Sequence, residues 1–156
     1  MNIAKQLEQF NINNVYFTDA IKNTVMDNGE FIRVIYSTPN MALNGISLLV
    51  KISNLQIEKY YNKLKCIFNI TSNRETIDKI KKFENEVLEK YNCSHKIICR
   101  NIGQQLEKGF LKLYSNSNII VNEKKSSADY LLKISGIWEN DNEYGITYKF
   151  IEVNHQ

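Results

Sequence analysis

The chain has 156 residues, of which 43% are hydrophobic and 24% charged, and its formal net charge is +3. These values are typical of one globular domain that can bury a core, and they exclude both a disordered chain and a nucleic-acid-binding domain recognisable by strong basicity alone. Because it contains three cysteines, an odd number, and no apolar stretch of signal-peptide or membrane-span length, we expect an intracellular protein in a reducing compartment, with no membrane partner.

The first third of the chain is predicted to form a three-stranded meander. Extended structure begins at residues 15–25, and the β-branched and aromatic run at 31–36 predicts a second strand. Asn44 and Gly45 stand between two apolar stretches and tolerate positive φ. They therefore predict a hairpin turn that leads into a third strand at 46–52.

One main helix is predicted in the middle of the chain. After a strand at 63–70, Ser72 and Glu75 have the spacing of a capping box, in which each side chain satisfies a free backbone N–H. Apolar residues then recur every three or four positions as far as Tyr91, which places them on one helix face. Asn92 is the expected stop.

Residues 94–127 have weaker patterns. Short strands are predicted at 97–99, 110–114 and 118–121, and a helical turn at 102–107. The chain then closes with its most regular feature, two strands joined by a polar loop.

These closing strands are predicted at 130–138 and 144–153. Because side chains alternate along a strand, one face of the pair is apolar and belongs in a core. That face is predicted to hold Tyr130, Leu132, Ile134, Trp138, Tyr144, Ile146, Tyr148 and Phe150. Lys133 and Lys149 lie on the opposite face, which could meet solvent or a polyanion. Gly136 indicates a bulge, a sharp bend or the close approach of another backbone.

A meander, a helix and a closing strand pair occur in this order in five-stranded Greek-key barrels of the OB (oligonucleotide/oligosaccharide-binding) type. We therefore predict a mainly β fold with one main helix, an OB-like Greek-key barrel with additional strands, in a single domain spanning residues 1–156. The additional strands leave a different β-barrel or a sandwich as the alternative.

The sequence contains no motif for catalysis. There is no glycine-rich phosphate loop and no nucleophile elbow, and the two histidines are His95 and His155. Cys93, His95 and Cys99 could supply zinc ligands, but their spacing matches no standard zinc knuckle. We therefore predict no enzymatic activity, no catalytic residue, no metal site and no cofactor.

Several aromatic residues are close to lysines or arginines, as in proteins that bind single-stranded nucleic acid by stacking and phosphate contacts. In an OB-like barrel the binding groove crosses the second and third strands, which the predicted meander assigns to the segments around Arg33 and Lys51. Most aromatics in a barrel are core residues, and Trp138 fits either a core position or a stacking platform. For Arg33 the alternative is a salt bridge to Glu30 or to a neighbouring carboxylate. The predicted nucleic-acid-binding residues are Arg33, Tyr36, Lys51, Phe110, Lys112, Tyr114, Lys133, Trp138 and Lys149.

Two stretches of the chain, 21–46 and 134–150, resemble small proteins of the nucleocytoplasmic large DNA viruses. The closing pair, with Gly-Ile-Trp at 136–138 and Gly-Ile-Thr-Tyr-Lys at 145–149, also resembles the last strands of viral and phage single-stranded DNA-binding proteins with OB folds. Several of those phage proteins have an acidic tail that recruits partners, whereas residues 152–156 of this sequence are not an acidic tail.

The resemblance implies a sequence-tolerant single-stranded DNA-binding protein that supports viral DNA replication or repair, with RNA as an open alternative ligand. It implies a location in the host cytoplasm or at a viral replication site, or packaging in the virion, and allows a homo-oligomer. The competing hypothesis is a virion structural or assembly protein built on a β-barrel, without nucleic-acid binding. That hypothesis predicts outward apolar faces at Leu111 and Leu113 and at Ile137 and Ile151.

Overall fold

The computed structural model describes residues 4–22, 29–60, 63–114 and 122–153, apart from the side chains of Tyr60 and Tyr114. The predicted strand at 118–121 lies outside these residues. The strands are β1 (Lys5–Gln6), β2 (Val15–Phe17), β3 (Ile21–Lys22), β4 (Glu30–Thr38), β5 (Met41–Asn44), β6 (Ile46–Tyr60), β7 (Lys63–Phe68), β8 (Ile97–Cys99), β9 (Phe110–Tyr114), β10 (Lys124–Glu139) and β11 (Glu143–Glu152). The helices are α1 (Arg74–Tyr91) and α2 (Asn101–Glu107), with 3₁₀ turns η1 (Leu7–Gln9), η2 (Ile12–Asn14) and η3 (Thr71–Asn73).

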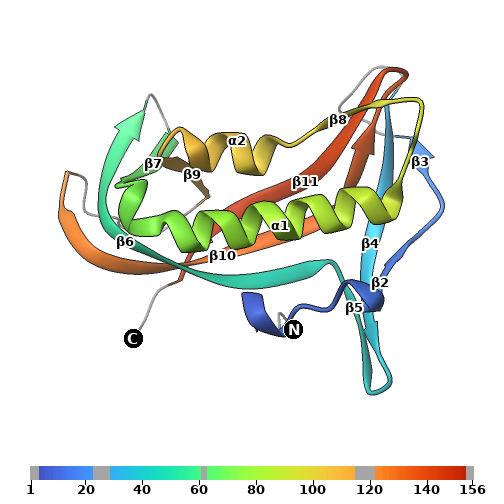
Figure 1. The fold of residues 1–156 in the computed structure, drawn as a ribbon, viewed down its shortest axis with the longest axis horizontal. Coiled ribbons are helices and arrows are strands. Elements are labelled where there is room, and N and C mark those ends of the chain that lie inside the picture. The colour runs from blue at the N-terminus through green and yellow to red at the C-terminus, as the bar shows by residue number, and fades with distance from the viewer. Residues whose placement is uncertain (1–3, 23–28, 61–62, 115–121, 154–156) are drawn as a thin grey trace.

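Five strands close into a barrel. β6 pairs with β7, β7 with β9, β9 with β11, β11 with β10, and β10 returns to β6. The β9–β11 pair is parallel and the other four pairs are antiparallel. β6, β7 and β9 are consecutive neighbours in the ring, and β10 returns to lie beside β6. This arrangement of four strands is a Greek key. The predicted OB-like barrel with additional strands and one main helix is confirmed (Figure 1).

Only the third strand of the predicted meander, at 46–52, belongs to this barrel, and the first two strands lie outside it. β4 joins the ring from outside by pairing with β10, and β2, β3 and β5 pair with β4. The first barrel strand is β6, whose fifteen residues pair with β10 and then with β7. Its buried side chains shift from even to odd positions between Ile52 and Leu55, across Asn54 at φ 51°. Because β6 is the first barrel strand, α1 and α2 come between the second and third barrel strands, β7 and β9, in the order of the sequence.

The predicted hairpin at Asn44 and Gly45 is wrong. β4 and β5 form the hairpin, while β5 and β6 pair with different strands. Gly45 has φ 84°, and a Cβ built on it would lie 2.6 Å from the carbonyl oxygen of Ile134. The positive φ therefore serves a tight turn that carries the chain from β5 past β10, which only glycine permits at this separation.

The predicted main helix is confirmed as α1, and Asn92, in the left-handed region, ends it. The predicted capping box does not form, because Ser72 lies in η3 and its hydroxyl accepts a hydrogen bond from the Asn54 amide at 2.8 Å. The apolar face of α1 is buried, and the helix lies across the sheet with α2 beside it (Figure 1). Phe10 in the N-terminal segment packs edge-on against Phe83, at 4.7 Å between ring centroids.

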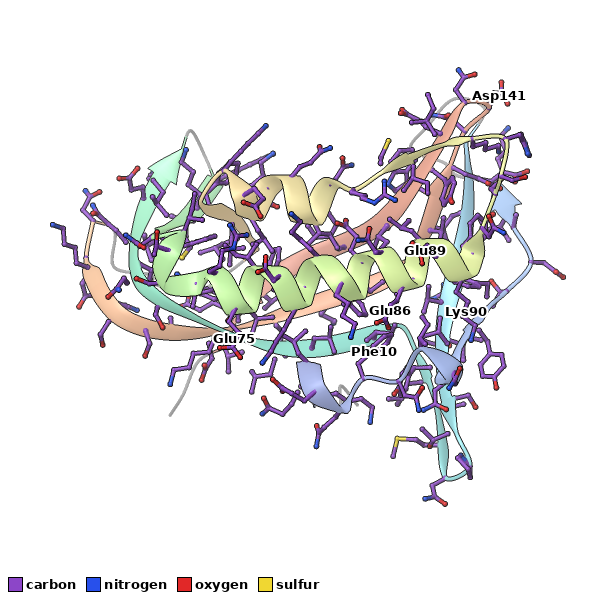
Figure 2. The ribbon with its side chains drawn as sticks, viewed as in Figure 1. Phe10, Glu75, Glu86, Glu89, Lys90 and Asp141 are labelled. Atoms are coloured by element: carbon purple, nitrogen blue, oxygen red, sulfur yellow. The ribbon has the colours of Figure 1, made fainter. Side chains whose placement is uncertain are left out.

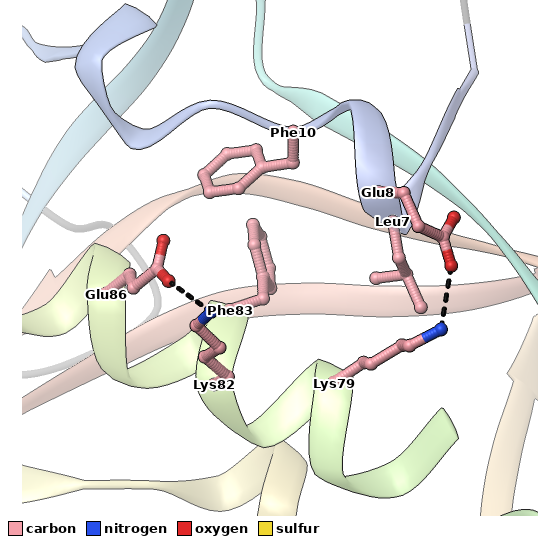
Figure 3. A pocket seen from close by; sticks show the side chains of 7 residues that line it. All are labelled: Leu7, Glu8, Phe10, Lys79, Lys82, Phe83 and Glu86. Carbon is pink, nitrogen blue, oxygen red and sulfur yellow. Dashed lines mark hydrogen bonds and ion pairs between the residues drawn. The ribbon is translucent and has the colours of Figure 1, made fainter. Parts of the chain in front are cut away.

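A small pocket of about 260 Å³ opens between this N-terminal segment and α1. Phe10 and Phe83 form its apolar wall, and the ion pairs Lys79–Glu8 at 2.9 Å and Lys82–Glu86 at 3.9 Å lie at its rim (Figure 3). Because both lysines there are matched by carboxylates, the pocket offers no excess charge to a ligand. Its contacts attach the N-terminal segment to the helix.

Two glutamates join α1 to α2. The buried carboxylate of Glu84, 1% exposed, accepts hydrogen bonds from the backbone N–H groups of Ile102 and Gly103, both at 2.9 Å. Burial raises the pKa of Glu84, and these two hydrogen bonds oppose the rise. On the surface, Glu107 of α2 forms ion pairs with Arg74 and Lys81 of α1. The first turn of α2 is thus capped by a side chain from the neighbouring helix.

Replacing Glu107 by glutamine is expected to lower the thermal midpoint at pH 7 and to change it little near pH 2. Hydrogen bonds from Arg74 and Lys81 lower the pKa of Glu107 from 4.5 to about 2. Because the pKa is lower in the folded state, this carboxylate stabilises the fold above its ordinary pKa, and the stabilisation is lost as the pH falls toward 2. Calorimetry of both proteins across this range measures the difference in midpoint.

The control variant is Glu89→Gln. Glu89 is exposed on α1 (Figure 2) and makes no ion pair within the described residues. A midpoint difference for Glu107→Gln that stays constant from pH 7 to pH 2 would contradict the assignment of the stabilisation to the Glu107 carboxylate.

Candidate functional site

A basic groove of about 470 Å³ lies where β4, β10 and β11 meet the turn into β6. Arg33 of β4, Lys133 of β10 and Lys149 of β11 bring three cations to it. The full lining is Arg33, Asn44, Gly45, Ile46, Ser47, Lys133, Ile134, Ser135, Thr147, Tyr148 and Lys149. It contains no aspartate or glutamate. We call this surface the basic groove.

The basic groove lies on the face of the sheet that points away from the core. Ile32 and Val34 of β4 are buried, so Arg33 between them points to the opposite side. On β10 and β11, Lys133 and Lys149 are directly opposite each other, with Ser47 opposite Lys133 on β6. The sequence-based placement of both lysines on one outward face is consistent with this register.

A β-bulge shapes the groove. The pairing of β10 with β11 shifts between Ile134 and Gly136, which leaves Ser135 without a partner residue on β11. Gly136 then pairs with Arg33, and a Cβ built on it would lie 2.2 Å from the carbonyl oxygen of Ile32. The indicated bulge and the indicated close backbone approach both occur here. Together they bring Arg33 to the same surface as Lys133.

The cations of the groove are poised to attract an anion. Arg33 and Lys133 make no ion pair within 4 Å among the described residues, so the alternative salt bridge from Arg33 to Glu30 or to a neighbouring carboxylate does not form. The guanidinium carbon of Arg33 lies 6.0 Å from the ring centroid of Phe31. Lys133 and Lys149 carry like charges at directly opposed positions, and an anion bound over both would reduce their mutual repulsion.

The bulge also decides the position of Trp138. Past Ser135 the alternation is reversed, so Ile137 is buried and Trp138 lies on the outward face, half-buried. The expectation that Trp138 shares a face with Tyr130 and Ile134 is therefore wrong. Its ring packs over Gly145, where a Cβ would lie 2.8 Å from Cζ2. Directly opposite on β4 is Phe31, so two aromatic rings flank the groove.

Two predicted residues lie apart from the groove. Tyr36 is 2% exposed in the core, and its hydroxyl accepts a hydrogen bond from the backbone N–H of Asn11 at 3.0 Å. The prediction that Tyr36 contacts nucleic acid is therefore not supported, because Tyr36 falls on the same buried face of β4 as Val34. Lys51 is exposed on the outward face of β6, opposite Asp129, but does not line the groove.

Three further predicted residues belong to a separate surface, on β7 and β9. Lys112 is exposed and directly opposite Lys65, whose ammonium lies 5.4 Å from the ring centroid of the half-buried Phe110. Leu111 and Leu113 point into the barrel, as the alternation predicts. The side chain of Tyr114 lies outside the described residues. This β7–β9 surface thus presents two lysines and one aromatic ring.

Sequence reasoning did not select Phe31, Ser135 or Thr147. The signal for Phe31 was its position two residues before Arg33, which puts both on one face of a strand. Ser135 is visible as a groove residue only once the bulge is known. Within the described residues, no group of three or more histidine, cysteine or acidic side chains could hold a metal ion.

No helix in the described part of the chain is long and apolar enough to cross a membrane. The chain matches no protein-family model, and neither a curated protein nor a solved structure shows significant similarity to it.

Proposed function

We propose that the protein binds single-stranded nucleic acid, with DNA as the principal ligand, through the basic groove. The observation that carries the proposal is the convergence of Arg33, Lys133 and Lys149 from three strands into a groove without carboxylates, beside two outward aromatic rings. Backbone phosphates would contact the cations and the hydroxyls of Ser135 and Thr147.

Single strands fit this surface better than duplexes do. Trp138 and Phe31 lie on the same sheet face as the cations, so a bound strand must present bases and phosphates to one surface. Unpaired bases can do so because they are free to stack on aromatic rings. Lysine contacts to phosphate and stacking on rings carry little sequence information, so binding would be sequence-tolerant.

The biological setting follows from the resemblance alone. We propose a supporting role in viral DNA replication or repair, by coating exposed single strands in the host cytoplasm or at a viral replication site. This is a binding role that requires no catalytic residue and no cofactor. RNA remains a ligand to be compared with DNA in the same assay.

Binding to labelled oligo-dT is expected to weaken by about twentyfold between 50 and 200 mM salt. Three phosphate contacts on a single strand give a slope of about −2 for log affinity against log salt concentration. Fluorescence anisotropy over a salt series measures this slope. Absence of binding at low salt, or an affinity independent of salt, would exclude the proposed function.

The virion-assembly alternative has a different surface in its favour. The outward faces expected at Leu111, Leu113 and Ile137 are wrong, because these side chains are buried. Ile21, however, is 58% exposed on β3, beside Phe31. Size-exclusion chromatography of the sample used for anisotropy separates the two functions, since stable oligomers without nucleic-acid affinity would favour assembly.

A further inference from the structure

Tyr16 of β2 has an unusually open ring. It is 55% exposed and is the one aromatic residue among the exposed large hydrophobic side chains that the structure describes. Exposed aromatic rings are the side chains on which single-strand-binding proteins stack bases. The position of Tyr16 relative to the basic groove therefore determines whether it could serve the same ligand.

The strand register places Tyr16 on the face of the sheet that carries the basic groove. Tyr16 is directly opposite Ile35, while its neighbour Val15 is opposite the buried Tyr36. Ile35 follows Arg33 by two residues and so shares its outward face. Along β4 this face reads Phe31, Arg33, Ile35, with Tyr16 beside the last of them. The register thus places Tyr16 on the strand next to β4, two residues along from the level of Arg33.

A cation accompanies the ring. The ammonium of Lys90 lies 5.4 Å from the ring centroid of Tyr16 and donates a hydrogen bond to the carbonyl oxygen of Ile12 at 2.8 Å. Figure 2 shows Lys90 at the C-terminal end of α1, on the side of the N-terminal segment. The hydrogen bond holds this charge beside the ring. An aromatic ring next to a fixed cation is the same combination that Phe31 and Arg33 present at the groove.

We propose that Tyr16 is a second base-stacking platform, which extends the bound strand along the outward face of β4 beyond the basic groove. This inference rests on the proposed function. Phe31 and Ile35 are separated along β4 by about 13 Å. Arg33 lies between these two positions on β4, so the two aromatic ends suit a site of about four nucleotides, at the low end of the range for an OB barrel.

The test compares wild type, Tyr16→Ala and Tyr16→Phe on dT₂ and dT₁₂ by anisotropy at low salt. On dT₁₂, Tyr16→Ala is expected to bind about tenfold more weakly, and Tyr16→Phe, which keeps the ring, to bind like wild type. On dT₂, which can fill only one end of the site, Tyr16→Ala is expected to match wild type. Because Tyr16 is exposed, all three proteins should have the same thermal midpoint, measured on the same samples.

Other outcomes overturn the inference in distinguishable ways. If wild type binds dT₁₂ and Tyr16→Ala binds it equally well, the groove functions without Tyr16 and the proposed function stands. Equal losses in Tyr16→Ala and Tyr16→Phe would assign the effect to the hydroxyl, and equal losses on dT₂ and dT₁₂ would deny an extended site. If wild type binds neither oligonucleotide, the proposed function fails and the inference fails with it.

Discussion

Replacing both Lys133 and Lys149 by glutamate is expected to weaken the binding of labelled oligo-dT by about a hundredfold at 50 mM salt. The double variant removes two of the three groove cations and leaves two carboxylates facing the phosphates beside Arg33. Losing two phosphate contacts should also reduce the salt slope by about 1.4. The thermal midpoint should hardly change, since one pair of like charges replaces another on an outward face.

A matched control separates the location of the charges from their number. Lys82 of α1 and Lys108 after α2 are exposed and lie outside the basic groove, so Lys82→Glu/Lys108→Glu makes the same change in net charge. This control should retain most of the affinity. Equal losses in the two double variants would indicate a general charge effect. Unchanged affinity in the groove variant would show that the basic groove is not the binding site. The β7–β9 surface with Phe110 and Lys112 would then be tested next.

Replacing Gly136 by alanine is expected to lower the free energy of unfolding by about 3 kcal/mol and to weaken oligo-dT binding as well. The added Cβ would lie 2.2 Å from the Ile32 carbonyl oxygen and 2.7 Å from the Phe31 ring. A backbone oxygen cannot rotate away as a side chain can, so β4 must move off β10. Arg33 and Phe31 would then leave their places at the groove. Urea unfolding and anisotropy measure the two effects.

Gly103→Ala is the control for that substitution. The nearest atoms to a Cβ at Gly103 belong to the side chains of Lys81 and Glu84, at 3.0 and 3.2 Å. Both are side-chain atoms at distances that a shift of a few tenths of an ångström relieves, and alanine favours a helix by up to about 1 kcal/mol relative to glycine. This variant should therefore lose much less stability and keep its affinity. A Gly136→Ala protein as stable as wild type would show that β4 tolerates a shift at this contact.

The types of most elements could be predicted from the sequence, but the identity of the strand that opens the barrel could not. The helix at 74–91 and the strands at 110–114 and 144–152 follow from local periodicity, which the chain expresses clearly there. The closure of the ring depends on pairs such as Ile46 with Ile134, which are distant in sequence. Periodicity says which face of a strand is apolar and nothing about which strand lies beside it. The predicted meander therefore assigns to the barrel two strands, at 15–25 and 31–36, that lie outside it.

Some residues at the basic groove could likewise be predicted from the sequence, and others could not. Arg33 was identified because an arginine among aliphatic and aromatic neighbours must point away from the core. Trp138 could not be placed, because one unpaired residue at Ser135 reverses the alternation that a two-residue period assumes. Gly136 indicates an irregularity in the strand, but it does not determine on which face of the sheet Trp138 lies. The prediction for Tyr36 is wrong because β4 alternates regularly, without a bulge, and Tyr36 therefore lies on the buried face with Ile32 and Val34.

The central position of β10 has a consequence for the order of folding. β10 pairs with β4, β6 and β11, and three of the five strand pairs that form the barrel involve β10 or β11. A nascent chain that has not yet reached residue 124 can form the α1–α2 pair and the β4–β5 hairpin, which are local. It cannot close the ring or assemble the groove, because such distant pairings form slowly and late. Affinity for a ligand in the groove should thus be acquired only after β10 and β11 have been synthesised.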